Sequence, residues 1–266
     1  MRRGLGAATV YGAMVALVAP LLPLILWSVA AAWPWPDLLP RTFSGRAWML
    51  LLDPDAGFLR ALGTSCGVAS MVTAIALIVS LPLARILGLG RFPGKSLLEA
   101  VVLLPILVPA FVSAMGLHET LIGWGLADTF AGVVLLHLVP STPYMVRTLA
   151  TGYALLGTRL EDQARTLGAR PLRVLWSVTL PRLLPAVVLG STFVFLSSFG
   201  EYLLTLLAGG DEVRTLPLVL YPFIAAGDRP IAAMGSLLLC VGPFLTMLLL
   251  EKLLARQPLY HRLPGI

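Results

Sequence analysis

Apolar residues gather into long runs along this chain, and shorter polar segments separate the runs. A helix that crosses a bilayer needs roughly 20 mostly apolar residues. Segments of this kind lie at about residues 9–32, 62–86, 97–122, 129–150, 183–207 and 231–254. Four prolines interrupt the third and fourth segments, namely Pro105, Pro109, Pro140 and Pro143. Neighbouring helices can accommodate proline inside a membrane, so the pattern predicts an all-α polytopic membrane protein whose six transmembrane helices, some kinked, form one domain over 1–266.

Composition supports a membrane protein. Of the 266 residues, 58% are hydrophobic and 12% are charged, and the mean hydropathy is +0.90. Soluble domains carry about 25% charged residues, so we expect lipid to be the solvent for this chain. Cys66 and Cys240 both fall in apolar runs, where small core residues are expected and a disulfide is not.

The N-terminus has two possible interpretations. Arg2 and Arg3 precede an apolar stretch, and Ala30-Ala31-Ala32 resembles a signal-peptide cleavage site. A signal peptide has an apolar region of about 7–15 residues, and the stretch here is longer. This length favours an uncleaved first transmembrane helix.

Basic residues are distributed unequally between alternate loops. With the N-terminus in the cytoplasm, the inside segments hold fourteen Lys and Arg residues and the outside segments hold five. Lys and Arg concentrate on the cytoplasmic side of membrane proteins. We therefore predict cytoplasmic termini and a cytoplasmic loop over 151–182. These loops also account for the net charge of +6, so no nucleic-acid partner is expected.

Two features bear on assembly. The expected outer loop over 33–60 contains Trp33, Trp35 and Trp48, which predict a segment anchored at the membrane surface. The chain has no internal repeat long enough to form two halves of a transporter. A pore on a two-fold axis would therefore need a second subunit.

The polar segment over 158–181, called the elbow below, predicts a helix-turn-helix. Thr158-Arg159-Leu160-Glu161 fits a capping box, in which the Glu161 carboxylate reaches back to the Thr158 amide. Glu161 and Arg165 are four residues apart and are expected to pair. Gly168 is expected to end the first helix, which is about nine residues long. Pro171 is expected to open a second short helix that ends at Pro181.

The elbow resembles the EAA loop of permeases from binding-protein-dependent ABC importers of the MetI-like family. That pattern is Glu-Ala-Ala, three residues, Gly, nine residues, Ile, any residue, Leu-Pro. Here it is matched by Asp162-Gln163-Ala164, then Gly168, then Val178-Thr179-Leu180-Pro181. Asp162, Gln163 and Val178 depart from the pattern, Gln163 most strongly. The predicted helices and the Leu104-Pro105 and Pro109 positions also resemble this family.

The resemblance implies a transport role in the bacterial inner membrane. The residues expected to couple to two copies of a cytoplasmic ABC ATPase are Glu161, Asp162, Gln163, Ala164, Gly168, Leu180 and Pro181. A second permease subunit, identical or different, and a periplasmic or lipid-anchored binding protein are also implied. The chain lacks the GxxxxGK[ST] phosphate loop, so we expect no cofactor and no enzymatic activity in this subunit.

Polar residues near the end of the fifth predicted helix are candidates for the transport pathway. Glu201 follows Ser198 and precedes Tyr202, and an acidic residue inside a membrane often has a function. Glu201 equally fits a residue that bonds a neighbouring helix. His137 in the fourth predicted helix is expected to be a hydrogen-bonded packing residue. His118, Glu119 and Asp128 have no metal-ligand spacing, so no metal site is expected.

Other functions stay open from the sequence. A channel or secondary transporter would work without an ATPase, and a membrane enzyme would need a nucleophile and base such as Ser65 and His137. The residues around Glu201 and 216–221 resemble the family branch for polyamines, thiamine, iron, sulfate or molybdate. The acidic residues Glu201, Asp211 and Glu212 favour a cation such as a polyamine or thiamine, with iron or an oxyanion as the alternative.

Overall fold

The computed structural model describes residues 12, 14, 16, 18–34, 36–210 and 212–255. The start of the first predicted transmembrane helix, Trp35 and Asp211 lie outside the described residues. Within them, the chain divides into two compact units. Unit 1 comprises residues up to 63 together with 215–242, and unit 2 comprises 64–214 together with the residues from 243 onward.

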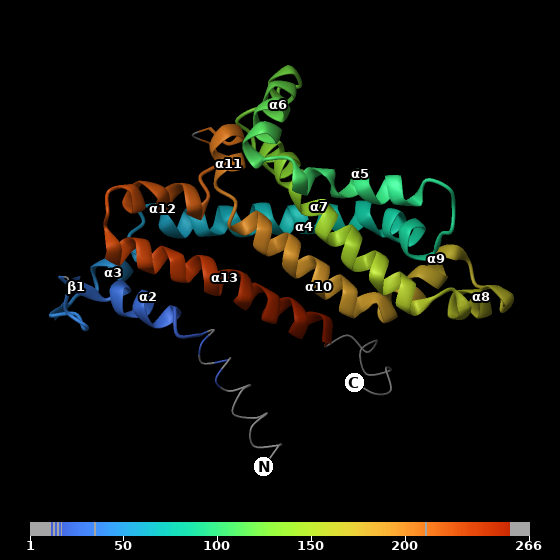
Figure 1. Cartoon of the computed structure of the whole chain (residues 1–266), viewed down its shortest axis with the longest axis horizontal. Coiled ribbons are helices and arrows are strands. Elements are labelled where there is room, and N and C mark those ends of the chain that lie inside the picture. The colour runs from blue at the N-terminus through green and yellow to red at the C-terminus, as the bar shows by residue number, and fades with distance from the viewer. Residues whose placement is uncertain are drawn as a thin grey trace, which may run out of the picture. The chain divides into compact units, whose positions relative to one another are not determined.

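Unit 1 is built from short helices and a two-stranded antiparallel sheet (Figure 1). Its elements are α2 (Leu21–Ser28), β1 (Ala30–Ala32), β2 (Thr42–Phe43), α3 (Arg46–Leu52), the start of α4 (Phe58–Leu89), α12 (Leu216–Ala225) and the first part of α13 (Arg229–Ala255). The first predicted helix was expected to continue to residue 32. This boundary is wrong, because the helix ends at Ser28 and the next residues pair with β2. Helix α12 occupies a segment that the sequence assigned to an outer loop.

Side-chain contacts join the separate segments of unit 1. Arg46 at the start of α3 forms an ion pair with Asp228, directly before α13. The rings of Phe58 and Phe223 lie with centroids 5.5 Å apart. These contacts connect the segment over 33–60 with α12 and the start of α13.

Unit 2 contains the remaining helices. They are the rest of α4, α5 (Lys95–Leu107), α6 (Ala110–Gly123), α7 (Phe130–Leu156), α8 (Arg159–Thr166), α9 (Pro171–Val174), the π-helix η1 (Leu175–Thr179), α10 (Leu180–Phe199) and α11 (Leu203–Ala208). Helices α7 and α10 pack along each other, as Figure 1 shows. Their contact contains the buried side chains Met145, Leu149, Leu183 and Val187. The elbow lies at one end of this pair.

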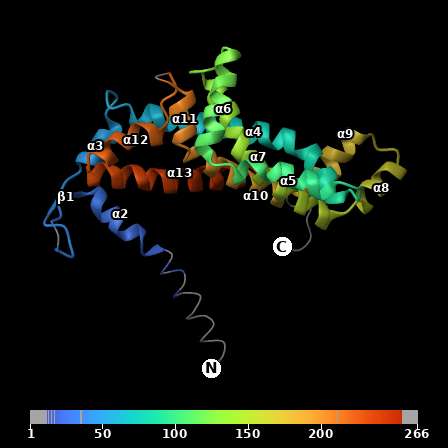
Figure 2. The same cartoon turned by 45° about the horizontal axis from the view of Figure 1, so that its top comes forward.

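Two of the predicted transmembrane helices are broken in unit 2. Helices α5 and α6 are bent by 95° relative to each other at Val108-Pro109, and α6 projects steeply from α5 (Figure 2). The fifth predicted helix was expected to be continuous to residue 207, but it breaks at 200–202 between α10 and α11. The prediction of a continuous fifth helix is therefore wrong at 200–202, whereas the break at Val108-Pro109 lies at one of the prolines from which kinked helices were predicted. Pro109 explains the first break, because proline disfavours helical backbone in the residue before it.

By length and composition, two helices in the described part of the chain could cross a membrane. They are Phe58–Leu89 and Pro171–Phe199, and the bent pair α5 and α6 adds a third if it counts as one span. The all-α membrane fold is confirmed. The two cysteines differ from expectation, since Cys66 is only partly buried and Cys240 is exposed.

Candidate functional site: the elbow and an adjacent cavity

The first helix of the elbow ends as the sequence predicts. Helix α8 covers Arg159–Thr166, eight residues, and Gly168 follows it with φ of +82°. The Gly168 amide donates to the Arg165 carbonyl at 2.9 Å, and the Ala169 amide donates to the Ala164 carbonyl at 3.0 Å. These two bonds form a Schellman motif, which glycine favours because left-handed backbone costs it little.

The second helix of the elbow begins as predicted but does not end at Pro181. Pro171 occupies the first turn of α9, where its missing N–H has no partner to lose. The helix then continues through η1 into α10, so that one helix runs over Pro171–Phe199. The predicted stop at Pro181 is wrong, because this proline lies in the first turn of α10, directly after the π-helix. The elbow is therefore continuous with a transmembrane helix.

Glu161 does not form the predicted capping box. The Thr158 side chain makes no capping hydrogen bond. The Glu161 side chain is 4% exposed, and its carboxylate bonds the Arg85 guanidinium of α4. It also accepts a hydrogen bond from the Thr179 hydroxyl of η1 at 2.7 Å. The predicted pair with Arg165 is present, with an N–O distance of 3.6 Å. The long-range partners thus replace the local cap.

The other candidate coupling residues are placed differently. Asp162, Gln163 and Gly168 are exposed, whereas Ala164, Leu180 and Pro181 are partly buried. Three large apolar residues of the elbow are also strongly exposed, at 88% for Leu167, 71% for Leu172 and 66% for Trp176. The elbow therefore combines a buried carboxylate that faces its own chain with a mixed polar and apolar outer surface.

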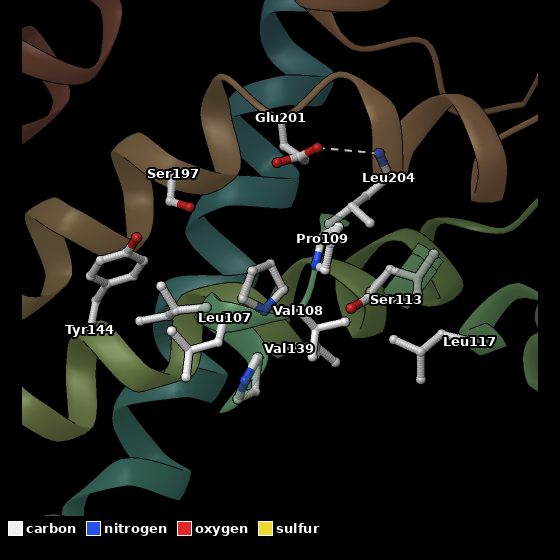
Figure 3. A pocket seen from close by; sticks show the side chains of 14 residues that line it. Leu107, Val108, Pro109, Ser113, Leu117, Val139, Tyr144, Ser197, Glu201 and Leu204 are labelled. Carbon is white, nitrogen blue, oxygen red and sulfur yellow. Dashed lines mark hydrogen bonds between the residues drawn. The ribbon is translucent and has the colours of Figure 1, made fainter. Parts of the chain in front are cut away.

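A cavity of about 360 Å³ lies where the two helix breaks of unit 2 meet (Figure 3). The α5–α6 break contributes Leu107, Val108 and Pro109, and the α10–α11 region contributes Ser197, Glu201 and Leu204. Helix α7 contributes Val139, Pro140 and Tyr144, and α6 contributes Ser113 and Leu117. Pro105, Pro109 and Pro140 line this cavity, and Pro143 lines a second, apolar cavity between α4, α5 and α7. The segments that carry these prolines thus do line cavities, and the structure shows a break at Pro109.

Glu201 is the one charged residue among the described residues that line the first cavity. It is partly buried, and its carboxylate accepts a hydrogen bond from the Leu204 amide at 3.2 Å, as Figure 3 shows. The hydroxyl groups of Ser113, Tyr144 and Ser197 supply the other side-chain polar atoms of the lining. The side chains of the cavity therefore offer one carboxylate and three hydroxyls among apolar groups.

The two other pathway candidates do not line the described cavity. Ser198 is buried, and its hydroxyl lies 2.9 Å from His137 Nδ1. His137 Nε2 lies 3.0 Å from the Thr205 hydroxyl of α11. His137 is thus the hydrogen-bonded packing residue that the sequence predicted, and it bonds both sides of the α10–α11 break. Tyr202 lies within that break.

Sequence reasoning did not identify Arg85, Thr179 or Ser197. Arg85 is one of the fourteen basic residues of the predicted inside segments, and it lies 76 residues from its partner Glu161. No local signal links residues at such separation. Asp128 was considered only as a metal ligand. Its amide instead donates to the Ala208 carbonyl at 2.9 Å, which connects the α6–α7 turn with the end of α11.

Comparison with known proteins identifies the class. Residues 76–257 match the family described as binding-protein-dependent transport system inner membrane component. The chain is 32% identical to a molybdenum transport system permease protein of Mycobacterium tuberculosis, over 89% of this chain and 90% of the relative. It is 26% identical to a putrescine transport system permease protein of Escherichia coli K12, over 84% of this chain and 81% of that protein.

A solved structure supports the same fold. The chain matches a bacterial ABC transporter involved in import of the acidic polysaccharide alginate, with a TM-score of 0.70 and 16% identity. The match covers 94% of this chain and 95% of the other. The chain belongs to the family of inner membrane components of binding-protein-dependent transport systems, and it is a permease subunit of an ABC importer.

Proposed function

We propose that this chain forms half of a translocation pathway and couples it, through the elbow, to a cytoplasmic ABC ATPase. The complete importer contains two ATPase copies, a second permease subunit and a periplasmic or lipid-anchored binding protein. ATP hydrolysis takes place in the ATPase, and this subunit is not an enzyme. The observation that carries the proposal is the elbow, in which the short polar helix α8 is followed by a second helix that is continuous with a transmembrane helix.

The exposed surface of the elbow supports a protein partner. An isolated helix shorter than about 12 residues is marginal in water, so α8, which has eight residues, needs packing on more than one side. Its own chain covers the Glu161 side. Leu167, Leu172 and Trp176 are exposed within a segment that also carries several arginines. A surface that mixes apolar and charged residues is unfavourable against lipid tails but can pack into a groove of a cytoplasmic protein.

Co-purification tests this docking. Asp162→Lys reverses an exposed charge on α8 and is expected to abolish association with the ATPase while membrane insertion is unchanged. Glu119→Lys makes the same change on exposed α6, outside the elbow, and serves as the control. Normal ATPase association of the Asp162→Lys variant would count against the docking assignment.

We further propose that solute passes through the cavity lined by Glu201. Substrate sites of membrane transporters are often formed by discontinuous helices, and this cavity lies at two such breaks. Glu201→Gln keeps the size of the side chain and removes its charge. It is expected to change uptake at least several-fold with ATPase association unchanged, whereas Glu119→Gln is expected to leave uptake unchanged. Equal uptake by the Glu201→Gln and Glu119→Gln variants would refute a role of Glu201 in the pathway.

The substrate we propose is an oxyanion such as molybdate. Molybdate is the soluble form of oxidised molybdenum. The 32% identity to the mycobacterial molybdenum permease over 89% of this chain supports it. A polyamine is the second candidate, because the charged residue of the cavity is a carboxylate and a relative serves putrescine. Uptake of labelled molybdate and labelled putrescine by the reconstituted importer distinguishes them. Transport of putrescine alone would overturn the oxyanion assignment.

A further inference from the structure

Glu161 is an unusual residue for a cytoplasmic elbow, because its side chain is only 4% exposed. A buried carboxylate is retained only where charged or hydrogen-bonding partners compensate its lost hydration. Here those partners come from three elements, with Arg85 on α4, Thr179 on η1 and Arg165 on α8 itself. Asp162, the neighbouring acidic residue, is exposed.

The helices that hold Glu161 are closely packed at this end of unit 2. A Cβ atom on Gly88, one turn from Arg85, would lie 2.5 Å from the Ala150 carbonyl oxygen of α7. A Cβ atom on Gly152 of α7 would lie 2.7 Å from the Ala186 Cβ of α10. Helices α4, α7 and α10 therefore approach each other too closely here for a larger side chain. Arg85 projects from a rigid base.

The backbone that connects α7 to the elbow is less constrained than the packed ends of α4, α7 and α10. Gly157 ends α7 with φ of +65°, and no atom lies within 4 Å of the position its Cβ would take. A single open glycine between two helices is a natural bending point. A force applied to α8 would rotate this helix about Gly157 and the turn over 167–170 unless side chains connect α8 to the membrane helices.

We infer that Arg85, Glu161 and Thr179 form an internal tie that makes the elbow, the end of α4 and the start of α10 move as one body. This inference rests on the proposed coupling to an ATPase. Glu161 is a positioning residue in this scheme and does not contact the ATPase. Motion of the docked α8 reaches α4 through the Arg85–Glu161 pair, and the Thr179 bond fixes α8 against the helix that continues into α10. The cavity at the two helix breaks then responds at the far end of α10, where Ser197 and Glu201 line it.

The reconstituted importer tests the tie, with solute imported per ATP hydrolysed as the readout. Glu161→Gln and Arg85→Gln are expected to reduce this ratio by about tenfold, within the range of about 5- to 150-fold that coupling between sites typically spans. ATPase association is expected to be unchanged. The double variant is expected to be no worse than either single variant, because both remove the same interaction. Arg85→Lys keeps the charge and is expected to retain part of the coupling.

Glu99→Gln is the matched control, since Glu99 forms a half-buried pair with Lys95 at 4.0 Å on α5. Unchanged solute-to-ATP ratios in the Glu161 and Arg85 variants would overturn the tie. Loss of ATPase association in Glu161→Gln alone would also overturn it, because Glu161 would then act at the docking surface. A wild-type chain that binds no ATPase would instead refute the proposed function itself.

Discussion

Gly168 offers a direct test of whether the shape of the elbow matters for docking. Its φ of +82° lies in the left-handed region, and a Cβ added there would meet no atom within 4 Å. Gly168→Ala therefore introduces backbone strain without a steric clash. Left-handed helical backbone costs an L-residue roughly 1–2 kcal/mol. If docking requires the native turn, this strain lowers affinity for the ATPase by about 5- to 30-fold, since about 1.4 kcal/mol corresponds to a factor of ten.

The assay is a binding titration of the ATPase against the permease in lipid nanodiscs. Gly168→Asn is expected to bind more tightly than Gly168→Ala, because asparagine tolerates left-handed backbone better. Gly116→Ala is the control, since Gly116 lies within α6 and has open space around it without a positive φ. Equal affinities for wild type and Gly168→Ala, or weaker binding by Asn than by Ala, would refute the reasoning.

Three further predictions concern other parts of the chain. His137→Phe removes both buried hydrogen bonds across the α10–α11 break and is expected to lower the free energy of unfolding in detergent by about 1–3 kcal/mol. Trp176→Ser is expected to weaken ATPase binding at least several-fold. Trp124 is 68% exposed and lies outside the elbow, so Trp124→Ser is expected to have no effect on ATPase binding. Similar losses of binding in both variants would point to a general folding defect. Arg46→Ala is expected to lower the free energy of unfolding by no more than about 1 kcal/mol and to leave uptake unchanged. The reason is that the ion pair between Arg46 and Asp228 is exposed to solvent on the Arg46 side. A large loss of uptake would contradict this prediction.

Local sequence signals predicted the elbow well. Gly168 and Pro171 act through their own backbone preferences, and those preferences hold in almost any surroundings. The capping box failed for the opposite reason. Its spacing at Thr158 and Glu161 is a local pattern, but the Glu161 carboxylate instead pairs with the distant Arg85 on α4.

The two helix breaks also differ in how far local residues predicted them. Pro109 indicated that the third predicted helix was irregular, because proline changes the backbone directly. The break at 200–202 gave a weaker signal, since Gly200 and Glu201 interrupt the apolar run but do not exclude helical backbone as proline does. His137, which bonds both sides of that break, was correctly predicted as a packing residue. Its partners Ser198 and Thr205 depend on how α7 and the broken helix pack, which a single sequence does not specify.

Solute uptake into proteoliposomes that contain this permease and its partner subunit, with and without the ATPase, tests the central claim most directly. We predict uptake only when the ATPase, ATP and the binding protein are all present. Uptake at the full rate without the ATPase would contradict the account and would assign this chain to channels or secondary transporters.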